Sequence, residues 1–160
     1  MPKADLSVVR RIGVISDTHG LLRPQALAAL AGVELIIHAG DIGMPAVIAG
    51  LEALAPVIAV RGNNDVESWA HAIPETRDVR LHRTRVHLLH DVHLLAADVA
   101  GRADIVIAGH SHRPLVERRG TLLHLNPGSA GPRRFRLPVS VALLEHDGVA
   151  FAARIVELDV

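Results

Sequence analysis

The sequence contains no cysteine, which excludes disulfides and thiolate metal ligands. Its 17 basic and 17 acidic residues cancel when histidine is neutral. This balance removes the bulk electrostatic argument for binding nucleic acid or an anionic membrane. Long apolar runs are also missing, because residues 33–37 and 104–108 are far too short to span a bilayer. Any metal ligands must therefore be histidine, carboxylate or amide side chains.

The composition is that of a globular chain. Hydrophobic residues make up 49% and charged residues 21% of its 160 residues, which predicts a single domain over residues 1–160 with a sizeable core. The start, Met1-Pro2-Lys3-Ala4-Asp5, leads directly into a strand-like run without an apolar leader. We therefore expect a cytoplasmic protein. Histidine is abundant, with eleven copies, and its meaning depends on where these residues fall.

Apolar periodicity predicts alternating strands and helices in the first two thirds of the chain. The expected strands cover residues 11–16, 33–38, 57–60, 85–89 and 104–108, and the expected helices cover 24–30, 45–54 and 92–100. Residues 66–75 show no clear pattern. Antiparallel pairs are expected for 115–118 with 122–125, and for 139–145 with 149–157 around a two-residue Asp147-Gly148 turn. The pattern predicts an α/β fold of two packed sheets with helices outside.

Polar clusters follow the carboxyl ends of five expected strands, the edge at which open α/β sheets form ligand sites. The clusters are Asp17-Thr18-His19, Gly40-Asp41, Gly62-Asn63, His90 and Gly109-His110-Ser111-His112. A single strand-end aspartate is usually a turn residue, and a single histidine is usually a surface or core residue. Five such clusters together indicate a metal site. Mixed oxygen and imidazole donors favour Mn²⁺, Fe or Zn²⁺ over Ca²⁺, Mg²⁺ or copper.

These motifs, in this order over about residues 11–132, resemble those of the calcineurin-like metallophosphoesterase superfamily. The chain is most similar to the small bacterial and archaeal phosphodiesterases of that family, which also tend to carry the sequence found here as Asn126-Pro127-Gly128-Ser129. The resemblance implies a two-sheet α-β-β-α sandwich with mixed sheets and flanking helices. Because Asp41-Ile42-Gly43 lacks the Asp-Arg-Gly continuation of serine/threonine protein phosphatases, that activity is disfavoured.

The resemblance also implies a ligand set for two divalent metal ions. Asp17, His19 and His112 would hold one ion, and Asn63, His90 and His110 the other, with Asp41 bridging them. We expect Mn²⁺ first, with Fe, Zn²⁺ or Ni²⁺ as alternatives. The implied activity is phosphodiester hydrolysis by a hydroxide that bridges the two ions, acting on a small phosphodiester or nucleotide-like substrate.

Two other functions stay open at this point. One is a scaffold or interaction module, like the retromer subunit that shares this small fold but has weakened metal chemistry. The other is a phosphomonoesterase or nucleotidase. All seven ligand positions are present, which favours the phosphodiesterase. A homo-oligomer also stays open.

Departures from the family pattern concern the surroundings of the metals. Asn64 stands where many relatives have a histidine thought to protonate the leaving group, and an amide cannot give up a proton near neutral pH. We therefore expect a preference for good leaving groups such as aryl esters, unless His93 or another histidine substitutes. Asp91, where relatives usually have glycine, would accept a hydrogen bond from an imidazole or perturb the site.

Two further side chains have competing interpretations. Arg133 would steady a phosphate oxygen or be a solvated loop charge. His38 would support the metal ligands or simply pack at a strand end.

Overall fold

The computed structural model describes residues 4–160. The expectation that there is no apolar leader depends partly on residues 1–3, which lie outside this range. Two five-stranded sheets form the centre of the molecule. In the first, the order is β10 (Phe151–Glu157), β9 (Ser140–His146), β1 (Arg11–Ile15), β2 (Leu35–His38) and β3 (Val57–Ala59). In the second, it is β4 (Thr76–Leu81), β5 (Thr84–Leu89), β6 (Ile105–Ile107), β8 (Leu122–Asn126) and β7 (Leu115–Arg119).

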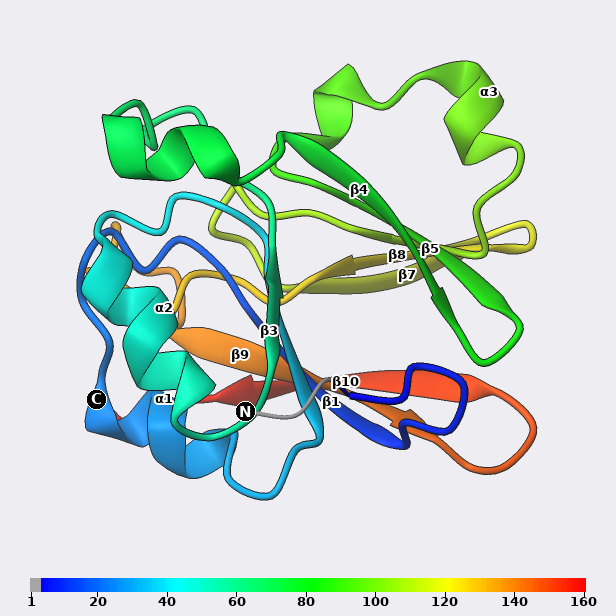
Figure 1. Cartoon of the computed structure of the whole chain (residues 1–160), viewed down its shortest axis with the longest axis horizontal. Coiled ribbons are helices and arrows are strands. Elements are labelled where there is room, and N and C mark those ends of the chain that lie inside the picture. Colours follow the sequence, from blue (N-terminus) through cyan, green and yellow to red (C-terminus); the bar gives the residue numbers. More distant parts are fainter. Residues whose placement is uncertain (1–3) are drawn as a thin grey trace.

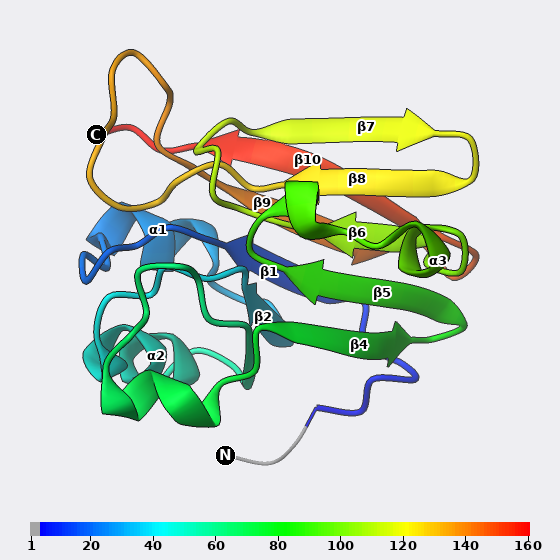
Figure 2. The same ribbon diagram turned by 90° about the horizontal axis from the view of Figure 1, so that it is seen from above.

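Helices cover the outer faces of the two sheets (Figure 1). α1 (Pro24–Ala29) and α2 (Pro45–Glu52) lie on the first sheet. The segment with the short 3₁₀ turn η2 (Val92–Leu94) and α3 (Ala97–Ala100) lies on the second, across β5 and β6, while β7 and β8 extend beyond it (Figure 2). A further 3₁₀ turn, η1 (Ser68–Ala72), precedes β4. Within residues 4–160, no helix has the length and apolar character needed to cross a membrane.

Alternating side chains along the strands produce these layers. In β1, Ile12 and Val14 belong to the core between the sheets, whereas Ile15 packs in the layer beneath α1 and α2. In β5, Val86 and Leu88 face the central core in the same way. Because strand side chains alternate between faces, one strand supplies both layers. The predicted α-β-β-α sandwich is confirmed.

The strand pairing gathers the strand ends at common edges. β1, β2 and β3 are parallel, with Ile15 opposite His38 and His38 opposite Ala59. β5, β6 and β8 are also parallel, with Leu88 opposite Ile107. The loops after these strands therefore leave each sheet on one side.

Three details of the predicted elements were wrong. Strand β4 was missed because Arg77, Asp78 and Arg80 interrupt its apolar pattern, as charges often do on edge strands. Residues 92–100 do not form one helix, since Leu95 is extended between η2 and α3. The expected two-residue turn is the four-residue loop 147–150 between β9 and β10, in which Asp147 Oδ1 accepts hydrogen bonds from two backbone N–H groups.

Candidate metal centre

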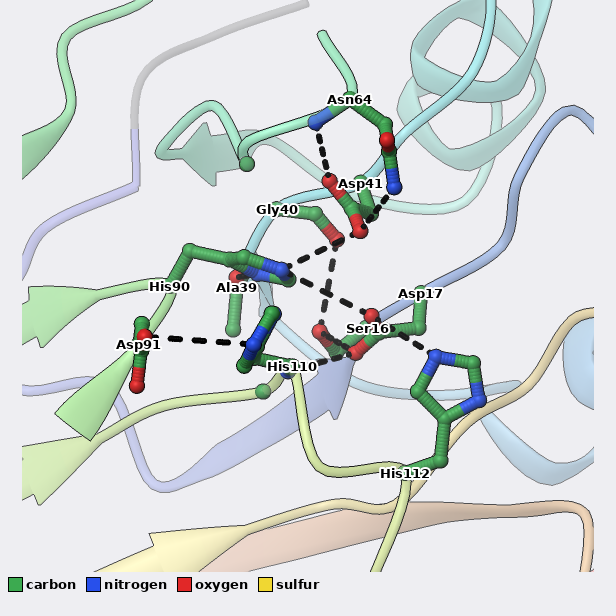
Figure 3. Close-up of polar contacts among 12 residues, drawn as sticks. Ser16, Asp17, Ala39, Gly40, Asp41, Asn64, His90, Asp91, His110 and His112 are labelled. Atoms are coloured by element: carbon green, nitrogen blue, oxygen red, sulfur yellow. Dashed lines mark hydrogen bonds and ion pairs between the residues drawn. The ribbon is translucent and has the colours of Figure 1, made fainter. Parts of the chain in front are cut away.

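Two groups of predicted ligands come together where the loops of both sheets meet (Figure 3). In each group the potential ligand atoms lie within 4.8 Å of one another; the groups are Asp17, His19 and His112, and Asp41, His90 and His110. The loops after β1 and β2 supply the aspartates and His19, and those after β5 and β6 supply the other histidines. The same grouping was assigned from the resemblance, apart from Asn63 and the bridging role of Asp41.

Hydrogen bonds hold one oxygen of the Asp17 carboxylate, and the other oxygen faces the site. Oδ2 accepts hydrogen bonds from Ser16 Oγ at 2.6 Å and from the backbone N–H of His110 at 3.1 Å. Oδ1 lies 3.2 Å from Nε2 of His112. Burial raises the pKa of Asp17, but His112, Ser16 and the charge of His90 outweigh it and lower the pKa below its ordinary value. This carboxylate is therefore ionised at neutral pH.

Buried polar atoms without hydrogen-bond partners mark the space between the two groups. They include Asp17 Oδ1, His19 Nε2 and His90 Nε2. Nε2 of both His19 and His90 lies near Asp41 Oδ2, at 3.7 Å and 3.2 Å. Because buried polar atoms in folded proteins normally have partners, these converging oxygen and nitrogen atoms fit divalent cations, and Asp41 is placed next to histidines of both groups.

Hydrogen bonds also orient His90 and Asp41. Nδ1 of His90 lies 2.7 Å from the carbonyl of Ala39, so this nitrogen carries the proton and Nε2 keeps its lone pair for a metal. Asp41 accepts from the backbone N–H and the side-chain amide of Asn64, both at 3.0 Å. Burial raises the pKa of Asp41, but His90 and Asn64 outweigh it and lower the pKa well below its usual range.

Backbone strain is concentrated in the ligand loops. Among residues 4–160, seven non-glycine residues have positive φ, and five of them are predicted ligands: Asp17, His19, Asp41, His110 and His112. Positive φ is uncommon for non-glycine residues, although Asp and His adopt it more readily than most, and such conformations cluster at functional sites. Two glycines allow the loops to approach closely, because a Cβ on Gly62 would collide with the Asp41 carboxylate and one on Gly109 with the Ser16 hydroxyl.

The remaining predicted site residues are exposed. Asn63 is exposed and shares a cavity with His90 and His110. Asn64 is exposed but has its amide against Asp41. Arg133 is exposed and donates to the backbone carbonyl of Val160 at 3.1 Å. Its expected contact with a phosphate stays a prediction.

Asp91 accepts from the imidazole of His93, which is not a predicted ligand, so its expected role beside the ligand histidines stays a prediction. Its Oδ1 accepts from the backbone N–H and lies near Nδ1 of His93, both at 3.0 Å. Its Oδ2 is 3.9 Å from Nε2 of His110. Asp91 thus lies between the exposed ring of His93 and the second ligand group.

His38 is a packed residue that joins two ligand loops. It is fully buried, and its Nδ1 accepts from the backbone N–H of Gly40 at 3.1 Å. Its Nε2–H therefore points to Thr18 Oγ1 at 3.0 Å, and that hydroxyl donates to the carbonyl of Ile42 at 2.8 Å. Burial lowers the pKa of His38 to about 4, so the ring is neutral at physiological pH.

The depressed pKa of His38 predicts a loss of stability in acid. In the unfolded chain the pKa of this histidine is about 6.5, so as the pH falls it is protonated there before it is protonated in the folded protein. Protonation therefore favours the unfolded state. For the metal-free protein, the contribution of His38 to the free energy of unfolding should fall by about 3 kcal/mol as the pH drops from 7.5 to 4. Urea unfolding of the wild type and of His38→Asn across this pH range measures the contribution of His38 to the free energy of unfolding. Equal pH dependence in both proteins would contradict the prediction.

Asp65 is a buried residue beside the site whose contacts the sequence interpretation missed. Its carboxylate accepts hydrogen bonds from the backbone N–H groups of Ile42, Gly43 and Gly62 at 3.0, 3.1 and 2.9 Å. It thereby fastens the loop of Asp41 to the loop of Asn63. The available signal was an aspartate three residues after Gly62, a position typical of side chains that close turns on their own backbone.

Replacing Asp65 with asparagine should loosen both loops. The amide nitrogen cannot accept, so at least one charge-assisted hydrogen bond is lost and the unfolding free energy should fall by about 1.5–3 kcal/mol. Mn²⁺ affinity should fall by about 10- to 100-fold. Urea unfolding and calorimetric titration measure the two effects. The exposed Asp98→Asn variant on α3 is the control, and wild-type values for Asp65→Asn would contradict the assignment.

Comparisons with known proteins agree with this geometry. Residues 11–148 match the model of the calcineurin-like phosphoesterase superfamily domain. The chain is 37% identical over 160 residues to a protein of Methanothermobacter thermautotrophicus named "Probable metallophosphoesterase", with 91% of each chain covered. It is 31% identical over 164 residues to the phosphodiesterase YfcE of Escherichia coli, covering 86% of this chain and 89% of that one.

A solved structure of an archaeal phosphodiesterase superposes with a TM-score of 0.75 at 26% identity, covering 91% of this chain and 99% of the other. The match to the family model spans most of the sequence and includes all seven predicted ligands. The resemblance seen in the motifs is therefore confirmed, together with the similarity to bacterial and archaeal members. The chain belongs to the calcineurin-like phosphoesterase superfamily.

Proposed function

We propose that the protein is a phosphodiesterase that uses two divalent metal ions, with Mn²⁺ as the first choice. The observation that carries the proposal is the pair of ligand groups whose unpartnered atoms converge beside Asp41. Asp17, His19 and His112 would hold one ion, and Asn63, His90 and His110 the other, with Asp41 shared. Two ions in such a site polarise a phosphoryl group and make water nucleophilic near neutral pH.

The protein's own part in this chemistry is to hold its donors in place with both carboxylates ionised. The hydrogen bonds to Asp17 and Asp41 hold both carboxylates in place, and the carbonyl of Ala39 fixes the tautomer of His90. Asn64 can donate a hydrogen bond to an ester oxygen but cannot supply a proton. The phosphodiester reading is supported by the names of YfcE and the archaeal relative.

We propose residues 1–160 as one catalytic domain, because ligands from both sheets build a single site. A small phosphodiester or nucleotide-like substrate follows from the same reading. The cytoplasmic location and the alternative of a homo-oligomer stay predictions.

The proposal is tested with bis-p-nitrophenyl phosphate and added Mn²⁺, with and without EDTA. We expect hydrolysis that EDTA abolishes and that exceeds the rate with p-nitrophenyl phosphate. A faster reaction with the monoester would favour the phosphomonoesterase alternative. No hydrolysis with Mn²⁺, Ni²⁺, Co²⁺ or Zn²⁺ by folded, metal-loaded protein would favour the scaffold instead.

A further inference from the structure

A cavity of about 480 Å³ opens next to the second ligand group. Asn63, His90 and His110 line one end of it, so a group attached to a phosphate at these residues can enter. Its volume lies within the range of about 300–1,000 Å³ that small-molecule pockets occupy. The cavity is therefore placed and sized to hold one ester group of a substrate.

The walls of this cavity are largely apolar. Thr76 and Leu89 lie opposite each other on β4 and β5 and form part of the sheet side. Leu94, Ala96 and Val99 come from the segment that crosses β5 (Figure 2). The side chain of Leu94 is 79% exposed, and covering it with an apolar group would remove that surface from water. The walls thus favour an apolar occupant.

The charged groups of the cavity already have partners. Arg61 Nη2 lies 3.1 Å from Glu75 Oε1, and Arg61 also donates to the carbonyl of Ile73. His87 has Nδ1 at 2.9 Å from Asp78 Oδ1, so Nδ1 carries the proton and Nε2 is left to accept a hydrogen bond. His87 Nε2, the Asn63 amide and the Thr76 hydroxyl offer polar contacts to a ligand, while the arginine of the lining, Arg61, is already paired, which favours an uncharged ring.

A neighbouring cavity of about 530 Å³ differs in this respect. It lies on the other side of Asp91 and His110, and Arg113, Arg119 and His124 are in its lining. Arg119 is already paired with Glu117, so a second negative charge on a substrate would be attracted chiefly to Arg113. An uncharged group lacks this electrostatic attraction, so the apolar cavity is its favoured site.

The position of Asn64 indicates which ester group enters. Asn64 is at the leaving-group position by resemblance and is outside the lining of the apolar cavity, whereas Asn63 is part of it. We propose that this cavity binds the ester group retained on the product phosphate, and that this group is an uncharged planar ring, aryl or nucleobase. This inference rests on the proposed phosphodiesterase function.

Three substrates with the same p-nitrophenol leaving group test the inference: the methyl, phenyl and thymidine-5′ esters of p-nitrophenyl phosphate. With Mn²⁺-loaded protein, kcat/KM should be about 10- to 100-fold higher for a ring ester than for the methyl ester. Preference for the phenyl ester alone would identify an aryl group, and preference for the thymidine ester a nucleobase. Equal values for all three esters would overturn the proposal.

Filling the cavity should remove the ring preference. Ala96→Phe projects into it from the covering segment, and Thr76→Trp fills it from the sheet side if the first variant folds poorly. Ala97→Phe is the matched control, because Ala97 is equally exposed but outside the lining. The ratio of phenyl to methyl ester rates should fall close to one in the filled variants only. An unchanged ratio in both filled variants contradicts the proposal.

Binding to metal-free protein gives a readout independent of catalysis. The methyl NMR signals of Leu89, Leu94 and Val99 should shift on titration with 4-nitroanisole or thymidine, and should not shift in Ala96→Phe. Shifts without hydrolysis of any ester would leave the cavity in place and remove the proposed function. Hydrolysis of the methyl ester with neither NMR shifts nor a ring preference would support the proposed function and contradict the proposed ring-binding cavity.

Discussion

Replacing Asp41 with asparagine should lower kcat/KM for bis-p-nitrophenyl phosphate by at least ~10³-fold. The carboxylate lies beside imidazoles of both ligand groups, 3.2 Å from His90 and 3.7 Å from His19. In the proposed two-metal site, losing this charge would weaken the hold on both cations. Metal stabilisation of a transition state amounts to several kcal/mol, and each ~1.4 kcal/mol is a factor of ten in rate. The protein should also retain fewer than two ions after gel filtration, as measured by elemental analysis.

The size and position of asparagine make this variant informative. It keeps the shape of Asp41 and can still accept the backbone N–H of Asn64, so the loop has little reason to unfold. Glu117→Gln, a change at a half-buried position on β7, controls for the loss of one acidic charge. If Asp41→Asn binds two ions and hydrolyses the diester like wild type, Asp41 is not shared between metals.

The parts of the site that could be predicted are those that local sequence specifies. Strands β1, β2, β5 and β6 are short apolar runs, and each ends at a polar residue such as Asp17 or His90. Parallel pairing then brings these ends to one edge. Motif order and strand order place these clusters at one edge, and the resemblance to the family supplied the grouping of the predicted ligands.

The parts that were missed depend on contacts between distant segments. Asp65 acts through backbone N–H groups of Ile42 and Gly43, more than twenty residues away, and no local pattern encodes that. The expected helix over 92–100 contains good helix formers, but Asp91 caps a short turn by accepting the N–H of His93, and the chain is extended at Leu95. Side-chain hydrogen bonds to the backbone overrode helix propensity there.

Asn64→His should give the opposite kind of result, a gain of activity on poor substrates. Asn64 lies against Asp41 and has no proton to give, so, with Asn64 at the proposed leaving-group position, we expect the alkoxide of an alkyl diester to depart unprotonated. A histidine there would act as general acid, and such catalysis contributes about 10²–10⁴-fold. We expect at least a ~10²-fold increase in kcat for dithymidine monophosphate, and little change for bis-p-nitrophenyl phosphate, because p-nitrophenolate leaves without a proton.

The pH profile and two further variants distinguish a new general acid at position 64 from an effect of this position on Asp41 and the metals. In Asn64→His the rate on the alkyl diester should fall as the pH rises past the pKa of the new imidazole, near 6.5 if its environment is ordinary. Asn64→Ala, which also loses the amide contact with Asp41, should show no gain. If His93 already supplies the proton, wild type will hydrolyse the alkyl diester readily, His93→Ala will remove that activity, and Asn64→His will add nothing. Equal acceleration of both substrates would mean that position 64 acts through Asp41 and the metals rather than on the leaving group.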